Sequence, residues 1–505
     1  KRTALYFLNL TISFNPKSLQ TNTISSQAKP LTKSIVGSTK MTSSGVEPTT
    51  VCHVVAMPFP GRGHINPMMN LCKFLASKKP DILITFVVTE EWLGLIGSEH
   101  KPANIRLATI PDGVIPPERL KAADFPAFYE AVMTKMEAPF EQLLDRLQMT
   151  PLTAIIADVE VLWGINVGKR RNIPVALSWT MSASFFTMLH YFNLFSANNN
   201  TPLDFVSKKG GNKNLVHVPG LSSLDTADLN VVFTENDQKV LKLALECISE
   251  VPKAQYLLLT SVYELEPQAI DTLRSEFAFP VYPIGPAIPY LDLHQHSSSP
   301  SSQNYLQWLD SQPKGSVLYI SLGSFLSVSS TQMDEIADGL RTSGVRFLWV
   351  ARSDAPRLKE RSGDLGLVLP WCDQLRVLCH SSVGGFWTHC GWNSTLEAVF
   401  GGVPMLTFPL FLDQVPNSRQ IVEEWKIGSR VKGDVGSCEN FVMKRDEIAE
   451  LVRKFMDFEI EEVKETRLKA GELRDVCLRA IDKGGSSDDS LDAFIRDICN
   501  VARGQ

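Results

Sequence analysis

The chain has 505 residues, of which 44% are hydrophobic and 21% charged, with a net charge of −5 at pH 7. This length predicts two domains, and an acidic balance without a basic block argues against a nucleic-acid-binding protein. The nine cysteines include no C-x-x-C pair, which predicts free thiols in a reducing compartment rather than a zinc site or a disulfide scaffold. We therefore expect a cytoplasmic protein whose partner is a small molecule.

The first 40 residues differ in composition from the rest of the chain. They contain six Lys or Arg and no Asp or Glu. Such a composition is typical of a transit peptide, but Met41 and the polar segment after it also fit an ordinary translation start. We expect residues 1–50 to be a disordered N-terminal extension, translated upstream sequence rather than a targeting peptide. No run of about 18 uncharged apolar residues occurs, so no membrane-spanning helix is predicted.

Strands and helices alternate over residues 51–285. Short apolar runs predict strands at 51–59, 82–89, 105–110, 154–158, 174–178 and 256–261. Helical patterns lie at 65–79, 91–96, 125–147, 163–171, 183–194, 238–249 and 267–277. The polar segment 198–214 predicts a mobile surface loop. This alternation is typical of a mostly parallel, doubly wound α/β sheet.

Residues 286–303 have no periodicity and predict a linker between two domains. A second series of alternating strands and helices is predicted over residues 304–490. It begins with strands at 316–321 and 346–351 and a helix at 331–342 between them. Helices at 445–457, 463–482 and 491–501 close the chain. The repetition of strand and helix predicts a second α/β domain.

Residues 371–414 are the most informative stretch. Apolar runs predict strands at 383–388 and 403–408, and the turn between them precedes a helix for which Ser394 is the expected N-cap, with Glu397 completing a capping box. A helix N-terminus offers unpaired N–H groups and the positive end of the helix dipole. With His389 and Asn393 beside it, this turn predicts a phosphate site.

Further side chains of the stretch fit the other parts of a nucleotide-sugar. Trp371 presents a flat face for a base, and Glu397 could accept hydrogen bonds from ribose hydroxyls. Asp413 and Gln414 follow the next strand and would lie at the same edge of the sheet, where they could bind a sugar. A nucleotide-sugar is therefore the ligand that accounts for the whole set.

At these residues the chain resembles the plant family 1 UDP-glycosyltransferases. W-x-x-Q, H-x-x-x-G-x-F, T-H-C-G-W-N-S, G-V-P and D-Q stand at the spacing of that family's 44-residue signature box. The resemblance covers about residues 51–502 and is looser outside the box. It implies a GT-B fold, two facing Rossmann-like domains with a cleft between them. Residues 51–285 would bind the acceptor and 304–490 the UDP-sugar, and a helix within 491–505 would pack back on the first domain.

The resemblance also implies the contacts of the donor site, residue by residue. Trp371 would stack on uracil and the Cys372 backbone would pair with its edge; Gln374 and Glu397 would meet the ribose; Ser324, His389, Asn393 and Ser394 would hold the diphosphate; Trp392, Asp413 and Gln414 would contact the sugar; Thr180 would lie near the donor phosphate or sugar. In the family, a Gln at the end of the box accompanies glucose more often than galactose. Gln414 therefore implies UDP-glucose.

His64 is the candidate catalytic base. It follows the first strand at the carboxyl edge of the sheet, where open α/β sheets bind ligands, and the start of a helix there favours a neutral imidazole. G-R-G-H alone is more typical of a structural turn. The resemblance places a catalytic His at this turn and an Asp at the end of a later strand, which is Asp158 here. Glu160 lies close by without a family match, and His380 is expected to bond locally.

The implied reaction is an inverting transfer of a sugar from a UDP-sugar to a small hydrophobic alcohol, phenol or carboxylic acid, such as a flavonoid, another phenolic, a terpenoid or a hormone. No Asp-x-Asp occurs in the chain, so we expect no metal and no other cofactor. The helix dipole and His389 would neutralise the leaving diphosphate. We further expect a monomer. Five aromatic residues could line an acceptor pocket, although their helical spacing is more typical of a core: Phe125, Phe128, Phe185, Phe186 and Tyr191.

Two other functions remain open from the sequence. A nicotinamide-dependent oxidoreductase would use the same sheets, but Asn66 occupies the position of the third glycine of the dinucleotide fingerprint. A non-catalytic nucleotide-sugar sensor would keep the box but would not need both His64 and Asp158. We therefore favour the transferase.

Overall fold

A computed structural model describes residues 52–117, 124–147, 151–197, 215–216, 218–221, 224–225, 238–293, 300–323, 328–431 and 442–501. All of them belong to one compact unit, Thr50–Gln505. The expected N-terminal extension 1–50, the loop 198–214 and Ser324 lie outside the described residues. None of the described helices combines the length and apolar character that crossing a membrane requires.

The first sheet has seven parallel strands in the order β3-β2-β1-β4-β5-β8-β9. Its strands are β1 His53–Met57, β2 Leu83–Thr89, β3 Ile105–Ile110, β4 Ala154–Asp158, β5 Val175–Trp179, β8 Tyr256–Leu259 and β9 Val281–Pro283. Its helices are α1 Arg62–Lys78, α2 Glu90–Ile96, α3 Phe125–Lys135, α4 Glu137–Arg146, α5 Trp163–Arg171, α6 Ala183–Ala197, α9 Gln238–Glu250 and α10 Pro267–Glu276. A short antiparallel pair, β6 Leu215–Val216 and β7 Leu224–Asp225, lies outside this sheet.

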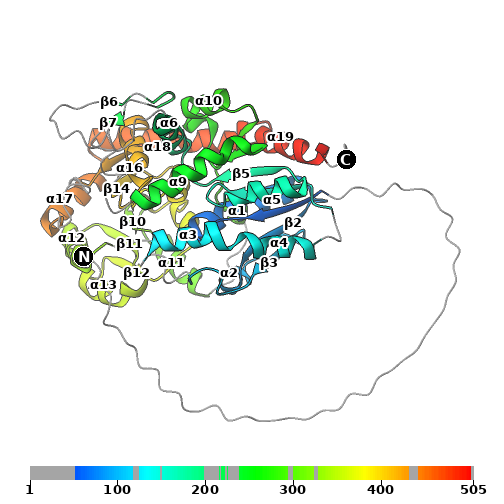
Figure 1. Cartoon of the computed structure of the whole chain (residues 1–505). Helices are drawn as coiled ribbons and strands as arrows, with labels where there is room; N and C mark the ends of the chain where they lie inside the picture. Colours follow the sequence, from blue (N-terminus) through cyan, green and yellow to red (C-terminus); the bar gives the residue numbers. More distant parts are fainter. Residues whose placement is uncertain are drawn as a thin grey trace, which may run out of the picture. The chain divides into compact units, whose positions relative to one another are not determined.

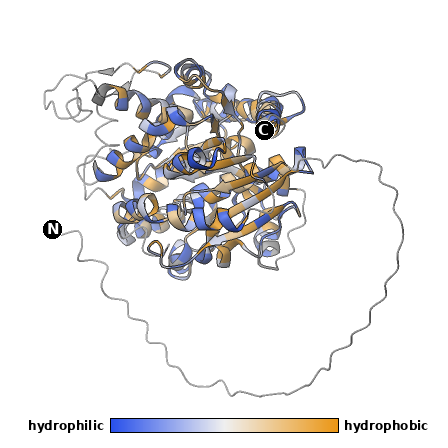
Figure 2. Ribbon diagram, turned by 45° about the vertical axis from the view of Figure 1, so that its right-hand side comes forward, coloured by the Kyte–Doolittle hydropathy of each residue, from blue (hydrophilic) through white to orange (hydrophobic). Residues whose placement is uncertain are grey.

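Alternate residues of the first sheet enter two separate cores. Val55 and Met57 of β1 join one apolar cluster, whereas Val54 and Ala56 join the other. Successive side chains of a strand point to opposite faces, and a parallel sheet is covered on both faces, so every residue of β1 is buried. Figure 2 accordingly shows the strands largely in hydrophobic colours and the helices around them in mixed ones.

The second sheet has six parallel strands in the order β12-β11-β10-β13-β14-β15. They are β10 Val317–Ser321, β11 Arg346–Val350, β12 Gly366–Leu369, β13 Val383–Thr388, β14 Met405–Thr407 and β15 Gly428–Arg430. Its helices are α11 Pro300–Asp310, α12 Ser330–Ser343, α13 Ala355–Ser362, α14 Gln374–Leu378, α15 Trp392–Gly401, α16 Gln414–Arg419, α17 Arg445–Met456 and α18 Glu461–Ile481, with a π-helical turn Gln420–Glu424. The expected fold class, two doubly wound α/β sheets, is confirmed (Figure 1).

Both sheets change the direction of strand order at one place, between β1 and β4 in the first and between β10 and β13 in the second. In open α/β sheets, ligands bind beyond the carboxyl ends of the strands at such a switch point. The turns after β1, β4 and β13 carry His64, Asp158 and His389. The topology therefore directs attention to these turns.

The last helix, α19 Ser486–Val501, packs on the first sheet (Figure 1, red). Leu491, Phe494 and Ile498 join the apolar cluster that contains Val54. The ring of Phe494 lies 5.8 Å from that of Tyr256. The last helix of the chain thus covers a part of the first sheet.

The domain limits stay a prediction. The expected linker contains a 3₁₀ turn at Tyr290–Asp292 and the first residues of α11.

Several helix boundaries differ from the prediction, and α19 begins at Ser486, five residues earlier than expected. The single helix expected over 125–147 is divided into α3 and α4 at Met136. Pro139 has no N–H to donate to the carbonyl of Lys135, so a continuous helix would lose a hydrogen bond and meet a steric clash there. Helix α1 begins at Arg62, three residues earlier than expected, which brings His64 into its first turn.

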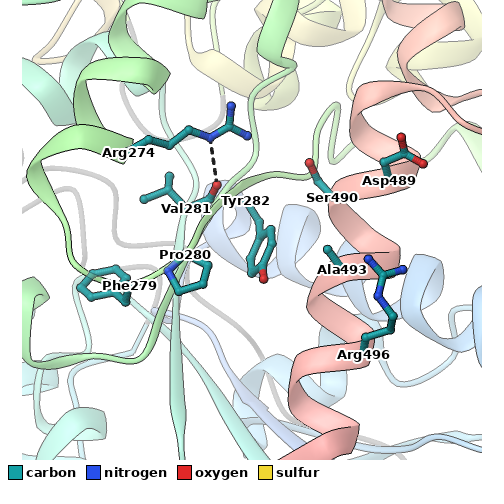
Figure 3. A pocket seen from close by; sticks show the side chains of 9 residues that line it. All are labelled: Arg274, Phe279, Pro280, Val281, Tyr282, Asp489, Ser490, Ala493 and Arg496. Atoms are coloured by element: carbon teal, nitrogen blue, oxygen red, sulfur yellow. Dashed lines mark hydrogen bonds between the residues drawn. The ribbon is translucent and has the colours of Figure 1, made fainter.

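A surface cavity of about 680 Å³ lies where β9 begins, between the end of α10 and α19 (Figure 3). Its lining residues are Arg274, Phe279, Pro280, Val281, Tyr282, Asp489, Ser490, Ala493 and Arg496. Since β9 starts here, the cavity is at the amino edge of the sheet, opposite the edge that carries His64. It is therefore separate from the site described next.

Candidate active site

The backbone after β1 fixes the position of His64. Gly61 is the N-cap of α1, and the amide of His64 donates to its carbonyl oxygen at 2.9 Å. The ring of buried Phe59 lies 5.1 Å from the imidazole. The imidazole is therefore held at the carboxyl edge of the sheet by local backbone and one aromatic ring.

Asp158 ends β4, the strand that pairs with β1, and is 1% exposed. Its Oδ2 lies 2.9 Å from Nδ1 of His64. A carboxylate accepts the Nδ1 proton, which leaves the lone pair of a neutral imidazole on Nε2. The expected pair is therefore brought together, in the orientation that a general base requires.

Thr180 lies beside the candidate base. It follows β5 and is 3% exposed, and its Oγ1 is 3.1 Å from Nδ1 of His64. The hydroxyl thus shares Nδ1 with Asp158. In this structure Thr180 positions the imidazole, and its expected contact with the donor stays a prediction.

Glu160 lies on the opposite side of the same imidazole. Its Oε2 is 3.6 Å from Nε2 of His64, and its amide donates to Oδ1 of Asp158 at 3.1 Å. One ligand atom from each of the three residues lies within 4.8 Å of the others, the one such group of His, Cys, Asp or Glu found among the described residues. The imidazole of His64 thus has a carboxylate beside each of its two ring nitrogens.

The turn after β13 differs from its prediction. Helix α15 begins at Trp392 with Gly391 as its N-cap, so Ser394 is not the cap and no capping box forms with Glu397. Instead, Nε2 of Gln374 donates to Oγ of Ser394 at 2.9 Å and to Oε2 of Glu397 at 2.6 Å. Burial raises the pKa of Glu397 to about 7. The three side chains expected around ribose and diphosphate therefore form one network.

His389 is tightly enclosed at the turn after β13. Gly323 has φ +89°, and a Cβ there would lie 2.8 Å from the imidazole. Burial lowers the pKa of His389 to about 4, and its Nδ1 has no hydrogen-bond partner among the described residues. At neutral pH the ring is therefore uncharged, so it can offer a diphosphate a hydrogen bond, while the positive end of α15 offers the charge.

Asn393 connects the two sheets at this point. Its Nδ2 donates to the carbonyl oxygen of Gly63 at 2.8 Å, next to His64. Trp392, by contrast, is 3% exposed and packs against Trp425 with ring centroids 6.1 Å apart. Its side chain belongs to the core, so the expected sugar contact would have to come from its backbone.

The end of the stretch 371–414 lies close to His64. Oε1 of Gln414 accepts from the amides of Leu410 and Phe411 at 2.8 and 3.1 Å, which holds the loop after β14. Burial raises the pKa of Asp413 to about 7; the charge of Glu160 adds to this effect and that of His64 opposes it. Asp413 is therefore within electrostatic reach of the catalytic candidates of the first sheet.

Trp371 and Cys372 point in opposite directions. Trp371 is 62% exposed, the condition that a stacking platform requires, whereas Cys372 is 5% exposed. The thiol lies 3.5 Å from the buried hydroxyl of Tyr319, so only the backbone of Cys372 could pair with a base. The eight cysteines among the described residues are free, as predicted.

UDP-glycosyltransferase 87A2 of Arabidopsis thaliana is 50% identical to this chain over 455 residues, which cover 90% of the chain and 98% of that protein. The chain belongs to the plant family 1 UDP-glycosyltransferases. UDP-glycosyltransferase 87A1 of the same plant is also 50% identical, over 88% of this chain and all of that one. Residues 231–439 match the model of the UDP-glucoronosyl and UDP-glucosyl transferase family. The expected enzyme class is confirmed, and the oxidoreductase alternative is set aside.

Solved plant structures share the fold of this UDP-glycosyltransferase. A Phytolacca americana enzyme in complex with UDP-2-fluoro-glucose and pterostilbene is 29% identical, with a TM-score of 0.74 over 89% of this chain and all of that one. A UDP-glucose:anthocyanidin 3-O-glucosyltransferase in complex with UDP is 26% identical, with a TM-score of 0.76 over 89% of this chain and 99% of that one. The GT-B architecture of the two sheets is thereby confirmed.

The aromatic candidates for an acceptor pocket in this UDP-glycosyltransferase divide into two groups. Phe128, Phe185 and Phe186 are buried in the core of the first sheet, as their helical spacing suggested. Tyr191 bonds to Glu276, and Phe125 meets Phe411 of the stretch 371–414 at 6.2 Å between ring centroids. Phe125 therefore contacts the stretch that is expected to bind the donor.

His380 behaves as predicted, since its two ring nitrogens bond to Ser382 at 2.8 Å and Asp310 at 3.1 Å. Sequence reasoning missed two other residues at the site of this UDP-glycosyltransferase, Phe59 and Tyr319, whose hydroxyl donates to Oε1 of Gln374 at 3.0 Å. It noted Glu160, two residues beyond the end of β4, as a neighbour of Asp158 and gave it no role.

Proposed function

We propose that this UDP-glycosyltransferase transfers glucose from UDP-glucose, with inversion, to a hydroxyl or carboxyl group of a small hydrophobic plant metabolite. The observation that carries the proposal is the 2.9 Å contact between Nδ1 of His64 and Oδ2 of Asp158 at the switch point of the first sheet. The bond from Asn393 to the Gly63 carbonyl brings the signature box to the same turn.

The donor half of the proposed site follows from the second sheet. Exposed Trp371 would stack on uracil, and the network of Gln374, Ser394 and Glu397 would meet ribose and diphosphate. Structurally similar plant enzymes have been solved with UDP-glucose, from Medicago truncatula, and with UDP-2-fluoro-glucose. These complexes support a UDP-sugar donor, and Gln414 supports glucose as its sugar.

The acceptor half is proposed from the chemistry around His64. Nε2 would take the proton of the acceptor hydroxyl as its oxygen attacks the anomeric carbon, and the bond from that carbon to the diphosphate would break. Asp158 would stabilise the imidazolium that forms. One displacement inverts the anomeric centre and gives a β-O-glycoside. Relatives named for 7-deoxyloganetin and anthocyanidin support an acceptor of the terpenoid or phenolic kind.

We also propose that the reaction needs no metal and no other cofactor, and that a cytoplasmic monomer performs it. The unpaired N–H groups and positive end of α15 would stabilise the leaving diphosphate. Turnover should therefore persist in excess chelator. Activity that disappears with chelator and returns only with Mg²⁺ or Mn²⁺ would contradict this part of the proposal.

The experiment incubates the purified protein with UDP-glucose, or UDP-galactose in competition, and an acceptor library, and identifies products by mass spectrometry and their anomeric configuration by NMR. His64→Ala should lower kcat by about 10² to 10⁴ because the general base is lost, while calorimetry should show UDP binding unchanged. His380→Ala changes a histidine that bonds to Ser382 and Asp310 rather than to Asp158; it is the matched control and should retain activity. UDP binding without any turnover would instead indicate a nucleotide-sugar sensor.

A further inference from the structure

The carboxylate of Glu160 lies beside the nitrogen of His64 that faces away from Asp158. Oε2 of Glu160 is 3.6 Å from Nε2, whereas Asp158 contacts Nδ1 on the other side of the ring. The side chain of Glu160 is 12% exposed and that of His64 18%. Nε2 is the atom to which the proposed reaction brings the acceptor oxygen, so Glu160 borders the place where that oxygen arrives.

The position of Glu160 is fixed by the same residue that orients the base. Oδ2 of Asp158 contacts His64, and Oδ1 accepts the amide of Glu160 at 3.1 Å. The flanking residues Val159 and Val161 are 1% and 0% exposed and belong to the core of the first sheet. Glu160 therefore stands at a defined place relative to Nε2.

The apolar surroundings strengthen the electrostatic effect of Glu160 on neighbouring groups. Buried Phe59 lies beside the imidazole, and the ring of buried Tyr129 is 5.3 Å from that of Phe59. The charge of Glu160 contributes to raising the pKa of Asp413 and of the Tyr129 hydroxyl. In an apolar environment a charge acts more strongly than in water. Glu160 thus influences both the acceptor side and the sugar side of the site.

We propose that Glu160 selects the acceptor: it binds a second hydroxyl adjacent to the reacting one and repels a carboxylate nucleophile. This inference rests on the proposed function and narrows its acceptor class from alcohols and acids to catechols and vicinal diols. An acceptor oxygen about 2.8 Å from Nε2 can approach from the side of Glu160, whose Oε2 is 3.6 Å from the same nitrogen. A neighbouring hydroxyl can then donate to the carboxylate, a charge-assisted hydrogen bond.

The bonds formed and broken follow from this arrangement. The first hydroxyl gives its proton to Nε2 of His64, its oxygen bonds to the anomeric carbon, and the bond from that carbon to the diphosphate oxygen breaks, so that UDP leaves with the electron pair. The second hydroxyl keeps its proton and its hydrogen bond to Glu160. A carboxylate acceptor would need no base, and its charge would face that of Glu160, which raises the energy of its approach.

The test compares three acceptors that share one ring: catechol, phenol and benzoate. Values of kcat/KM with UDP-glucose are measured for the wild type and for Glu160→Gln and Glu160→Leu. We expect the wild type to prefer catechol over phenol and to use benzoate least. Glu160→Leu should lower the catechol-to-phenol ratio about tenfold, since a hydrogen bond to a charged group is lost. Glu160→Gln keeps a side-chain oxygen that can accept a hydrogen bond but has no charge. Its catechol-to-phenol ratio should therefore lie between those of the wild type and Glu160→Leu, while its kcat/KM for benzoate should rise.

Glu99→Gln, an exposed carboxylate at the other edge of the sheet, is the matched control and should leave all three values unchanged. Melting curves of each variant establish that it is folded. Catechol-to-phenol and benzoate-to-phenol ratios that are the same in wild type and Glu160→Leu would overturn the role of Glu160 while leaving the proposed transferase intact. Bound UDP-glucose without glucoside from any of the three acceptors would overturn the acceptor class itself, and this inference with it.

Discussion

Replacement of Asp158 by Asn tests whether the charge of this carboxylate, and not only its shape, supports catalysis. The imidazolium and carboxylate, joined at 2.9 Å, have charge centres about 4 Å apart, and their attraction at an effective dielectric constant of about 20 is about 4 kcal/mol. Loss of that energy in the transition state lowers the rate about 10³-fold. Glu160, at 3.6 Å from Nε2, remains to offset a part. We therefore expect a loss between about 10² and 10³.

The assay for Asp158→Asn measures kcat and kcat/KM with UDP-glucose and a phenolic acceptor, together with UDP affinity by calorimetry. UDP affinity should stay at the wild-type value because the side-chain hydrogen bonds of Asp158 are to His64 and Glu160, on the acceptor side of the proposed site. Asp145→Asn, at an exposed carboxylate paired with Arg171, is the control and should keep full activity. A rate for Asp158→Asn within about threefold of the wild type would refute the reasoning. It would mean that the charge of Asp158 does not stabilise an imidazolium in the transition state.

Two further predictions concern the donor half. Trp371→Ala should raise the KM for UDP-glucose about tenfold, because base stacking contributes about 1–3 kcal/mol, and should move the melting temperature by less than about 2 °C since the ring is 62% exposed; an unchanged KM would show that uracil binds elsewhere. Burial raises the pKa of Glu397 from 4.5 to about 7, so the folded state holds a proton that the unfolded chain has released, and stability should fall by up to about 3 kcal/mol as pH rises from about 4.5 to above 7. Calorimetric melting of Glu397→Gln should show a smaller fall over that range, and an equal fall in both proteins would contradict the assignment.

The fold could be predicted to the extent that its strands are buried on both faces. Such strands are continuous apolar runs, and β1, β4 and β13 stand out in the sequence for this reason. Strands β12 and β15 were not predicted because they are short, with four and three residues, and begin with glycine; β15 is Gly-Ser-Arg and has no apolar run. Their place is determined by pairing with a neighbouring strand and not by their own composition.

The contact between His64 and Asp158 could be predicted for a topological reason. His64 and Asp158 each follow a strand, and the two strands are neighbours at the switch point of the sheet. The bond from Asn393 to Gly63 and the contact of Thr180 with His64 could not be predicted, because each joins elements that are far apart in sequence. Such contacts depend on how helices and sheets meet.

The network of Glu397 and the position of Glu160 were not predicted because both depend on contacts between different elements. A capping box is predicted from neighbouring residues alone, but the helix begins after Gly391, so Ser394 and Glu397 instead bond to Gln374 of another helix. Glu160 was noted in the sequence only for its place near Asp158, and its proposed role follows from the 3.6 Å between its Oε2 and Nε2 of His64. Under the proposed function, donor binding would rest on the contiguous stretch 371–414, whereas acceptor choice would depend on single side chains that tertiary structure brings to His64. Two enzymes alike in that stretch would then differ in acceptor through one such position, so variants of Glu160 test acceptor choice more directly than variants of the stretch.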